Sequence, residues 1–100
     1  MTTFEFWPDH GGALLWTDGG ERVSLDELPL PPDLVERARS WVADYDDAKL
    51  PWEPTRDEAW LGEGRRLFVD LRRALLERDI ELEPNEEFWG RVRLGEDPQP

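Results

Sequence analysis

Apolar and polar residues alternate near the start of the chain, as expected for strands with one buried face. Phe4 and Phe6 flank Glu5. The apolar run at 13–17 and a short segment at 21–23 follow, each preceded by a pair of glycines that allows a tight turn. The pattern predicts an antiparallel β-meander with strands at residues 4–7, 13–17 and 21–23.

Two longer segments carry apolar residues at helical spacing. The first stripe consists of Leu34, Val35, Ala38, Trp41, Val42 and Tyr45, and the second of Trp60, Gly64, Leu67, Phe68, Leu71 and Leu75. The spacing predicts helices at 32–47 and 56–78. Capping boxes of the form S/T-x-x-E are predicted at Ser24 and at Thr55. Gly64 lies on the second stripe, which predicts a close approach to another backbone at that position.

The C-terminal region returns to alternation, with Ile80 and Leu82 between acidic residues. This predicts a strand at 80–83 that joins the N-terminal sheet, followed by a turn at Pro84-Asn85. Residues 86–94 fit either a helix or a strand. Within them, apolar residues alternate with arginines near the end, which favours a last strand at 91–94.

Together these segments predict an α+β fold. Eleven aromatic residues argue against a disordered chain, because disordered acidic segments are poor in aromatic side chains. We expect one domain at residues 1–94 and a disordered tail at 95–100.

Acidic residues outnumber basic ones twofold, 24 against 12, which gives a net charge of −12. This argues against binding of nucleic acid by phosphate neutralisation and against docking on an anionic membrane. Residues 1–55 carry a net charge of −8, residues 56–80 are neutral and residues 81–100 carry −4. The acidity therefore has a location that a partner with a basic surface could recognise.

Residues suited to catalysis are scarce. Cysteine is absent and His10 is the single histidine, which excludes disulfides, thiolate zinc sites and an all-histidine metal site within one chain. Ser24 and Ser40 are the two serines, and neither stands in a nucleophile motif. We therefore predict a protein that is no enzyme, with no catalytic residue, no cofactor and no metal.

The densest carboxylates, Asp44, Asp46 and Asp47, lie near the end of the first predicted helix. A calcium loop would need a glycine and a glutamate where Lys49 and Thr55 stand, so metal binding is disfavoured. We interpret the acids as a solvated or partner-facing patch. The predicted partner contacts are Asp44, Asp46, Asp47, Trp52 and Glu53.

Six tryptophans make the chain unusually rich in that residue. Three fall on predicted core faces: Trp16, Trp41 and Trp60. The other three stand beside proline or glycine in connectors or edges: Trp7, Trp52 and Trp89. A tryptophan in a connector either covers the edge of a core or anchors a partner, and both interpretations stay open for Trp52.

Arginines on the second predicted helix are the candidates for contact with an anion. Arg65 or Arg72 could bind a phosphate or carboxylate, although pairing with the chain's own surplus of carboxylates is favoured. Eleven of the twelve basic residues are arginine, which is typical of a GC-rich bacterial genome.

The start of the chain shows no positive region followed by an apolar one, which predicts no secretory signal. No apolar run approaches the roughly 20 residues needed to span a bilayer. We expect a cytoplasmic location.

The order of Leu14-Leu15-Trp16, Asp18-Gly19, Leu28-Pro29-Leu30 and Trp41 with Tyr45 resembles that of a scattered group of small uncharacterised bacterial proteins. The resemblance covers about residues 13–82 and consists mostly of packing residues, so it implies a fold more than a function. Some small acidic proteins of this general appearance are immunity or antitoxin partners, which is the role that the resemblance implies.

The leading hypothesis is thus an acidic protein-interaction module, of the immunity or antitoxin kind, that masks a basic surface on its partner. One alternative is a structural accessory protein or homo-oligomer subunit that buries Trp52 or Trp89 between copies. The other is a small-molecule binder that uses Arg65 or Arg72.

Overall fold

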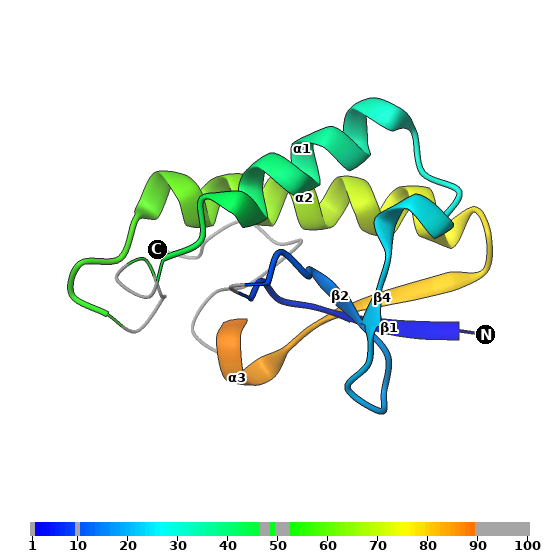
Figure 1. Cartoon of the computed structure of the whole chain (residues 1–100), viewed down its shortest axis with the longest axis horizontal. Coiled ribbons are helices and arrows are strands. Elements are labelled where there is room, and N and C mark those ends of the chain that lie inside the picture. Colours follow the sequence, from blue (N-terminus) through cyan, green and yellow to red (C-terminus); the bar gives the residue numbers. More distant parts are fainter. Residues whose placement is uncertain (1, 10, 47–48, 50–52, 90–100) are drawn as a thin grey trace, which may run out of the picture.

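A small mixed sheet carries two long helices across one face, which is the predicted α+β fold (Figure 1). The structure is a computed structural model that describes residues 2–9, 11–46, 49 and 53–89. Its elements are β1 (Thr2–Phe6), β2 (Leu15–Trp16), β3 (Arg22–Val23), the 3-10 helix η1 (Leu25–Glu27), α1 (Pro32–Ala43), α2 (Glu58–Leu76), β4 (Ile80–Pro84) and α3 (Glu86–Trp89).

The strands lie in the order β3-β2-β1-β4. β1 pairs with β2 and β2 with β3 in antiparallel fashion, which confirms the predicted meander, with β2 and β3 shorter than predicted. β4 joins this sheet as predicted and runs parallel to β1. Parallel neighbours need a long crossover connection, and here both long helices lie within that connection.

The sheet turns an apolar face towards the helices. Phe6 lies opposite Leu15 on β2, and Phe4 lies opposite Leu82 on β4. Because side chains alternate along a strand, Glu5 and its neighbours across the sheet, Trp16 and Glu83, face the other way. The period-two pattern of the sequence therefore correctly identifies the core face.

The boundaries of β1 differ from the predicted strand at 4–7. Pairing with β4 begins at Thr2, opposite Ile80, and this long-range contact has no signal in the local pattern. Trp7 follows the strand and stacks on Trp16, with ring centroids 4.3 Å apart, while the Trp16 indole N–H donates to the Trp7 carbonyl.

Both long helices are shorter than predicted. α1 ends at Ala43 rather than near residue 47, because the chain leaves helical geometry at the C-cap, Asp44. α2 begins at Glu58 because Asp57, and not Thr55, is its N-cap and accepts from the Trp60 amide. The capping box predicted at Ser24 is also wrong, since the Ser24 side chain makes no cap hydrogen bond to η1.

The chain changes direction twice after α2, once before β4 and once before α3. Asp79 adopts a φ of 60°, a left-handed conformation that aspartate tolerates better than most residues, and leads from α2 into β4. Asn85 then caps α3 by accepting from the Phe88 amide, so residues 86–89 form a helical turn. The predicted strand at 91–94 and the tail at 95–100 lie outside the described residues.

Trp89 belongs to the core and is 2 % exposed. Its indole N–H donates to the Phe6 carbonyl at 2.9 Å, and its ring stacks on Phe6. The expectation that Trp89 could anchor a second copy is therefore wrong, because the side chain is already buried within its own chain. Trp41 and Trp60 are buried in the core as predicted, whereas Trp16 is buried against Trp7 on the other face of the sheet.

Gly64 permits a close approach, but to side chains rather than to a backbone. A Cβ built on Gly64 would overlap the six-membered ring of Trp41 and lie 3.1 Å from Trp89 Cη2. The predicted contact with another backbone is thus corrected: two indole rings fill the space that glycine leaves beside α2.

Candidate functional site

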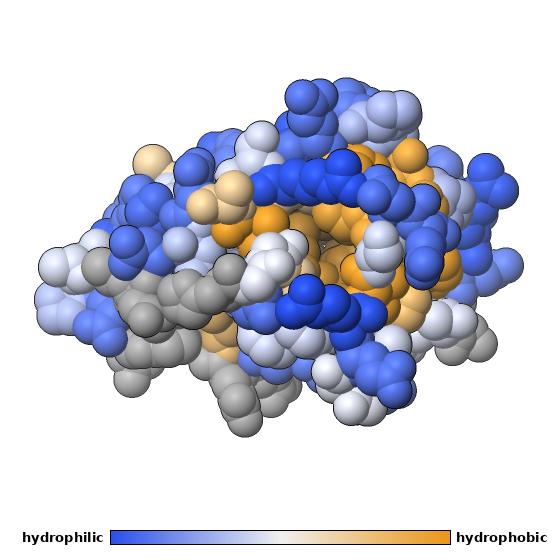
Figure 2. Space-filling model, in the orientation of Figure 1, coloured by the Kyte–Doolittle hydropathy of each residue, from blue (hydrophilic) through white to orange (hydrophobic). Residues whose placement is uncertain are grey.

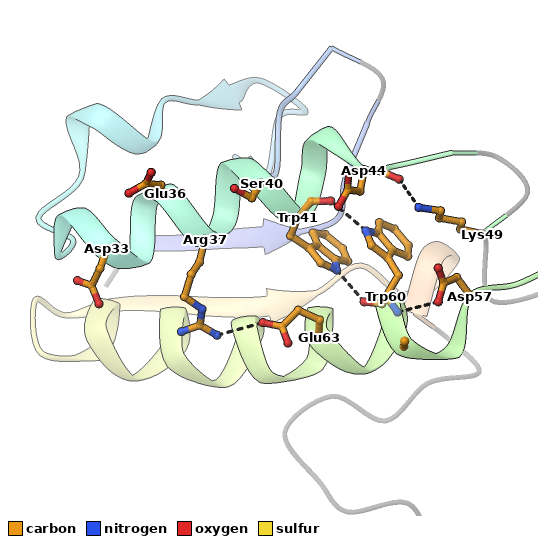
Figure 3. Close-up of a pocket in the computed structure, with 11 residues that line it drawn as sticks. Asp33, Glu36, Arg37, Ser40, Trp41, Asp44, Lys49, Asp57, Trp60 and Glu63 are labelled. Atoms are coloured by element: carbon orange, nitrogen blue, oxygen red, sulfur yellow. Dashed lines mark hydrogen bonds and ion pairs between the residues drawn. The ribbon is translucent and has the colours of Figure 1, made fainter.

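A groove of about 730 Å³ lies between α1 and α2 (Figure 3). Its ionisable lining residues comprise five acids and two bases. The acids are Asp33, Glu36, Asp44, Asp57 and Glu63, and the bases are Arg37 and Lys49. The groove therefore carries a net formal charge of −3 within a small area.

Two stacked tryptophans form the floor of the groove (Figure 3). The rings of Trp41 on α1 and Trp60 on α2 lie 4.3 Å apart and 5° from parallel. The Trp41 indole N–H donates to the Trp60 carbonyl at 2.7 Å, and the Trp60 indole N–H donates to the Trp41 carbonyl at 2.9 Å. This reciprocal pair, which we call the tryptophan clasp, joins the two helices at one fixed separation.

The sequence places the clasp by helical spacing. Trp41 lies on the apolar stripe of α1, one turn after Ala38, and Trp60 is the third residue of α2. The hydrogen bond from the Trp60 amide to Asp57 sets the start of α2 and so the position of the ring. Tyr45 packs edge-on against Trp60, with centroids 6.0 Å apart.

Lys49 lies at the end of the groove near the clasp. Its ammonium donates to the Asp44 carbonyl at 2.9 Å and lies 5.9 Å from the centroid of the Trp60 ring. An ammonium over an indole face gains cation–π energy, and a carbonyl at a helix C-terminus attracts positive charge. The chain's own lysine thus shows that this end of the groove accommodates a cation.

Arg37 spans the middle of the groove from α1 to α2. Its guanidinium lies 2.9 Å from Asp70 and 3.5 Å from Glu63, counting nearest N and O atoms. The hydrogen bond to Asp70, with the charges of both carboxylates, raises the pKa of Arg37. The pKa of the Glu63 carboxyl is lowered by its hydrogen bonds from Arg66 and by the charges of Arg66 and Arg37.

Replacing Glu63 with glutamine should lower the free energy of unfolding at neutral pH by less than about 1 kcal/mol, because exposed ion pairs contribute little. The folded pKa of Glu63 lies below its ordinary value of 4.5, so its contribution is present above that pH and is lost as the pH falls through the folded pKa. Denaturation curves of the two proteins should therefore differ at pH 7 and converge in acid. If the two proteins differed in free energy of unfolding by the same amount at every pH, the charge of the Glu63 carboxylate would not be the source of the difference.

Three carboxylates of the groove form no ion pair with any other residue that the structure describes. Within the described part of the chain, Asp33, Glu36 and Asp44 form no ion pair, and all three are exposed. Asp33 and Glu36 lie one turn apart on α1, followed by Arg37 and Ser40 on the same polar side (Figure 3). The groove thus offers charge that a cationic ligand could neutralise without first breaking an internal pair.

The predicted partner contacts meet different outcomes. Asp44 lines the groove, and Asp46 is exposed beyond the end of α1. Glu53 is half-buried and is not among the residues that line the groove. Asp47 and Trp52 lie outside the described residues.

The predicted anion contacts, Arg65 and Arg72, do not line this groove. The guanidinium of Arg72 lies 6.0 Å from the centroid of the Phe68 ring, one turn earlier on α2. Arg37 is the arginine that reaches the groove, and sequence reasoning missed it. The available signal was the polar side of α1, where Asp33, Glu36 and Arg37 recur at helical spacing.

Two further observations bear on the chemistry of the described residues. Among them, no group of three or more histidine, aspartate and glutamate side chains is arranged to hold a metal ion. No helix that the structure describes is both long enough and apolar enough to cross a membrane.

Comparisons of the chain with protein families, with curated proteins and with solved structures found no match.

Proposed function

We propose that this protein is a small acidic interaction module of the cytoplasm whose α1–α2 groove binds a basic segment of a partner protein. The observation that carries this proposal is the charge of the groove, with five acids against two bases around a rigid aromatic floor. In this role the protein needs no catalytic residue, cofactor or metal.

A guanidinium or ammonium group suits the groove for two physical reasons. The carboxylates of Asp33, Glu36 and Asp44, which pair with no other described residue, supply charge-assisted hydrogen-bond acceptors. The tryptophan clasp holds α1 and α2 together, so the acceptors are positioned before the partner arrives and less conformational entropy is lost on binding.

The acidity of the whole chain supports rapid association. A net charge of −12 attracts a basic partner over a distance of about one Debye length, roughly 8 Å at physiological salt. Masking a basic surface in this way is how an immunity or antitoxin-like inhibitor would act, and we propose that role for the module.

A charge-matched pair of double variants tests the proposal. Glu36→Gln with Asp44→Asn removes two charges from the groove, whereas Asp18→Asn with Glu77→Gln removes two exposed charges elsewhere. A partner captured from the native cell and then purified should bind the groove variant at least tenfold more weakly, with a shallower dependence on salt. Calorimetry at several ionic strengths measures both quantities.

The control variant should bind within about threefold of the wild type. It removes the same number of negative charges as the groove variant but leaves the groove intact. Equal weakening by the two variants would mean that the partner responds to overall charge alone. Undiminished binding by the groove variant would refute the groove as the site.

Self-association has less support. The buried position of Trp89 removes one of its two proposed anchors, and the other, Trp52, lies outside the described residues. Light scattering on concentrated protein distinguishes the hypotheses, since a strict monomer argues against a homo-oligomer and leaves the groove free for another protein.

A further inference from the structure

A second hollow lies on the opposite side of α1 from the groove, between that helix and the N-terminal hairpins. Figure 2 shows it as an apolar hollow with hydrophilic side chains around its rim. Its volume is about 370 Å³, which falls within the usual range for small-molecule pockets. We call it the hairpin recess.

The apolar residues in the walls of the hairpin recess come from separate elements. Ala13 and Leu14 precede β2, Val23 ends β3 and Leu25 begins η1. Leu14 and Leu25 also belong to the main core, so the floor of the recess is continuous with the core and is rigid. Val23 is half-buried, whereas Ala13, Leu14 and Leu25 are at most 8 % exposed, so an apolar ligand would cover mainly the surface of Val23.

The polar lining has the opposite charge from that of the groove. Arg22 from β3 and Arg39 from α1 line the recess, with Glu27 as the one acid among the lining residues. The lining residues therefore carry a net formal charge of +1 on a protein whose total is −12, and Asp9 and Asp26 lie beside the two arginines at the rim. Two of the chain's twelve basic residues, far apart in sequence, meet at this one hollow.

Both arginines keep donors for a ligand. Arg22 is 61 % exposed, and its guanidinium lies 3.8 Å from Asp9, too far for a hydrogen bond. The Asp9 carboxylate already accepts from the amides of Gly11 and Ala13, which shape the wall of the recess. Arg39 pairs with Asp26 across a surface where both side chains are more than half exposed, and such pairs are weak.

Gly11 allows the guanidinium of Arg22 to lie against the turn. A Cβ at Gly11 would lie 2.8 Å from Arg22 Nη2, so any larger residue would displace that group. The arginine thus occupies a place that the backbone leaves open beside the apolar wall.

We propose that the hairpin recess binds a small amphipathic anion, an apolar ring or short chain that carries one carboxylate or sulfonate group. The apolar part lies on Leu14, Val23 and Leu25, and the anionic group is bound by Arg22 and Arg39. This site is independent of the α1–α2 groove, and it uses neither Arg65 nor Arg72.

Two fluorescent probes of the same ring system test the proposal. 1-Anilinonaphthalene-8-sulfonate carries the anionic group, and N-phenyl-1-naphthylamine is its neutral counterpart. The wild type should bind the sulfonate at least fivefold more tightly than the neutral probe. Equal affinity would overturn the role of the arginines, and no binding of either probe would overturn the site.

Variants locate the binding. Arg22→Gln with Arg39→Gln should weaken binding of the sulfonate at least fivefold and leave the neutral probe unaffected, whereas Arg72→Gln with Arg73→Gln, on the exposed side of α2, should change neither. Ala13→Leu, which fills the recess, should weaken both probes. Near-ultraviolet circular dichroism checks that each variant is folded. If the Arg72/Arg73 variant lost as much affinity for the sulfonate as the Arg22/Arg39 variant, the assignment of the site to the hairpin recess would be overturned.

Discussion

Trp41→Ala is expected to lower the free energy of unfolding by about 3–5 kcal/mol, the usual cost of truncating a buried tryptophan. The substitution removes the stack on Trp60, the contacts with Phe6 and Trp89, and the hydrogen bond to the Trp60 carbonyl. Because domains of this size are stable by only about 5–15 kcal/mol, a large part of the total stability depends on this one side chain. Urea denaturation followed by circular dichroism measures the loss.

Trp41→Phe separates packing from hydrogen bonding. The ring is largely retained, but the Trp60 carbonyl loses the hydrogen bond from the Trp41 indole N–H, for an expected cost of about 1 kcal/mol. Trp7→Ala serves as the comparison, because Trp7 is only half-buried and stacks on Trp16 outside the clasp. A loss below about 1 kcal/mol for Trp41→Ala would contradict the account of the clasp.

Gly64→Ala should destabilise the protein by about 2 kcal/mol or more, although alanine is the better helix former. The added methyl group would overlap Trp41 and press on Trp89. Neither ring can yield freely, because each indole N–H is bound to a backbone carbonyl, at Trp60 and at Phe6 respectively. Thermal and chemical denaturation should both show the loss.

Gly62→Ala is the matched control, two residues earlier on the same helix. A Cβ at Gly62 meets only the ends of the Arg65 and Arg66 side chains, at 3.9 and 4.0 Å. This variant should gain up to about 1 kcal/mol from helix propensity. Equal effects of the two substitutions would show that the close approach at Gly64 does not constrain α2.

The periodic patterns predict the fold well because they report which face of each element is buried. The stripes on α1 and α2, and the alternation at Phe4 and Phe6, correctly identify residues that pack in the core. The ends of elements are less predictable, since they depend on contacts distant in sequence. β1 begins at Thr2 because β4, almost 80 residues later, pairs with it.

Trp89 shows a different limit of sequence reasoning. It follows two acidic residues and Phe88 and precedes a glycine, and the local pattern indicates an edge position. Its burial depends on the Asn85 cap of α3 and on the Phe6 carbonyl at the end of β1, which accepts from the Trp89 indole, and neither contact is visible in the local sequence. A buried tryptophan needs a partner for its N–H, and that partner is chosen by the tertiary fold.

The candidate site was predicted in part. The acidity of the N-terminal half and the position of Asp44 follow from residue order alone. The groove itself also needs Asp57 and Glu63 from the region that is neutral overall, because those two acids come to face α1 only when α1 and α2 pack together. Net charge per segment therefore identifies the acids that α1 contributes to the groove and misses those at the start of α2.

Titration with a six-residue arginine peptide, followed by NMR of the backbone amides, tests the central claim most directly. We predict that the shifts concentrate on residues that line the groove, such as Glu36, Ser40, Asp44 and Glu63, and on the indole N–H of Trp60. Shifts spread evenly over all acidic regions, including Glu21, Glu81 and Glu83, would contradict the proposal that the groove recognises a basic partner.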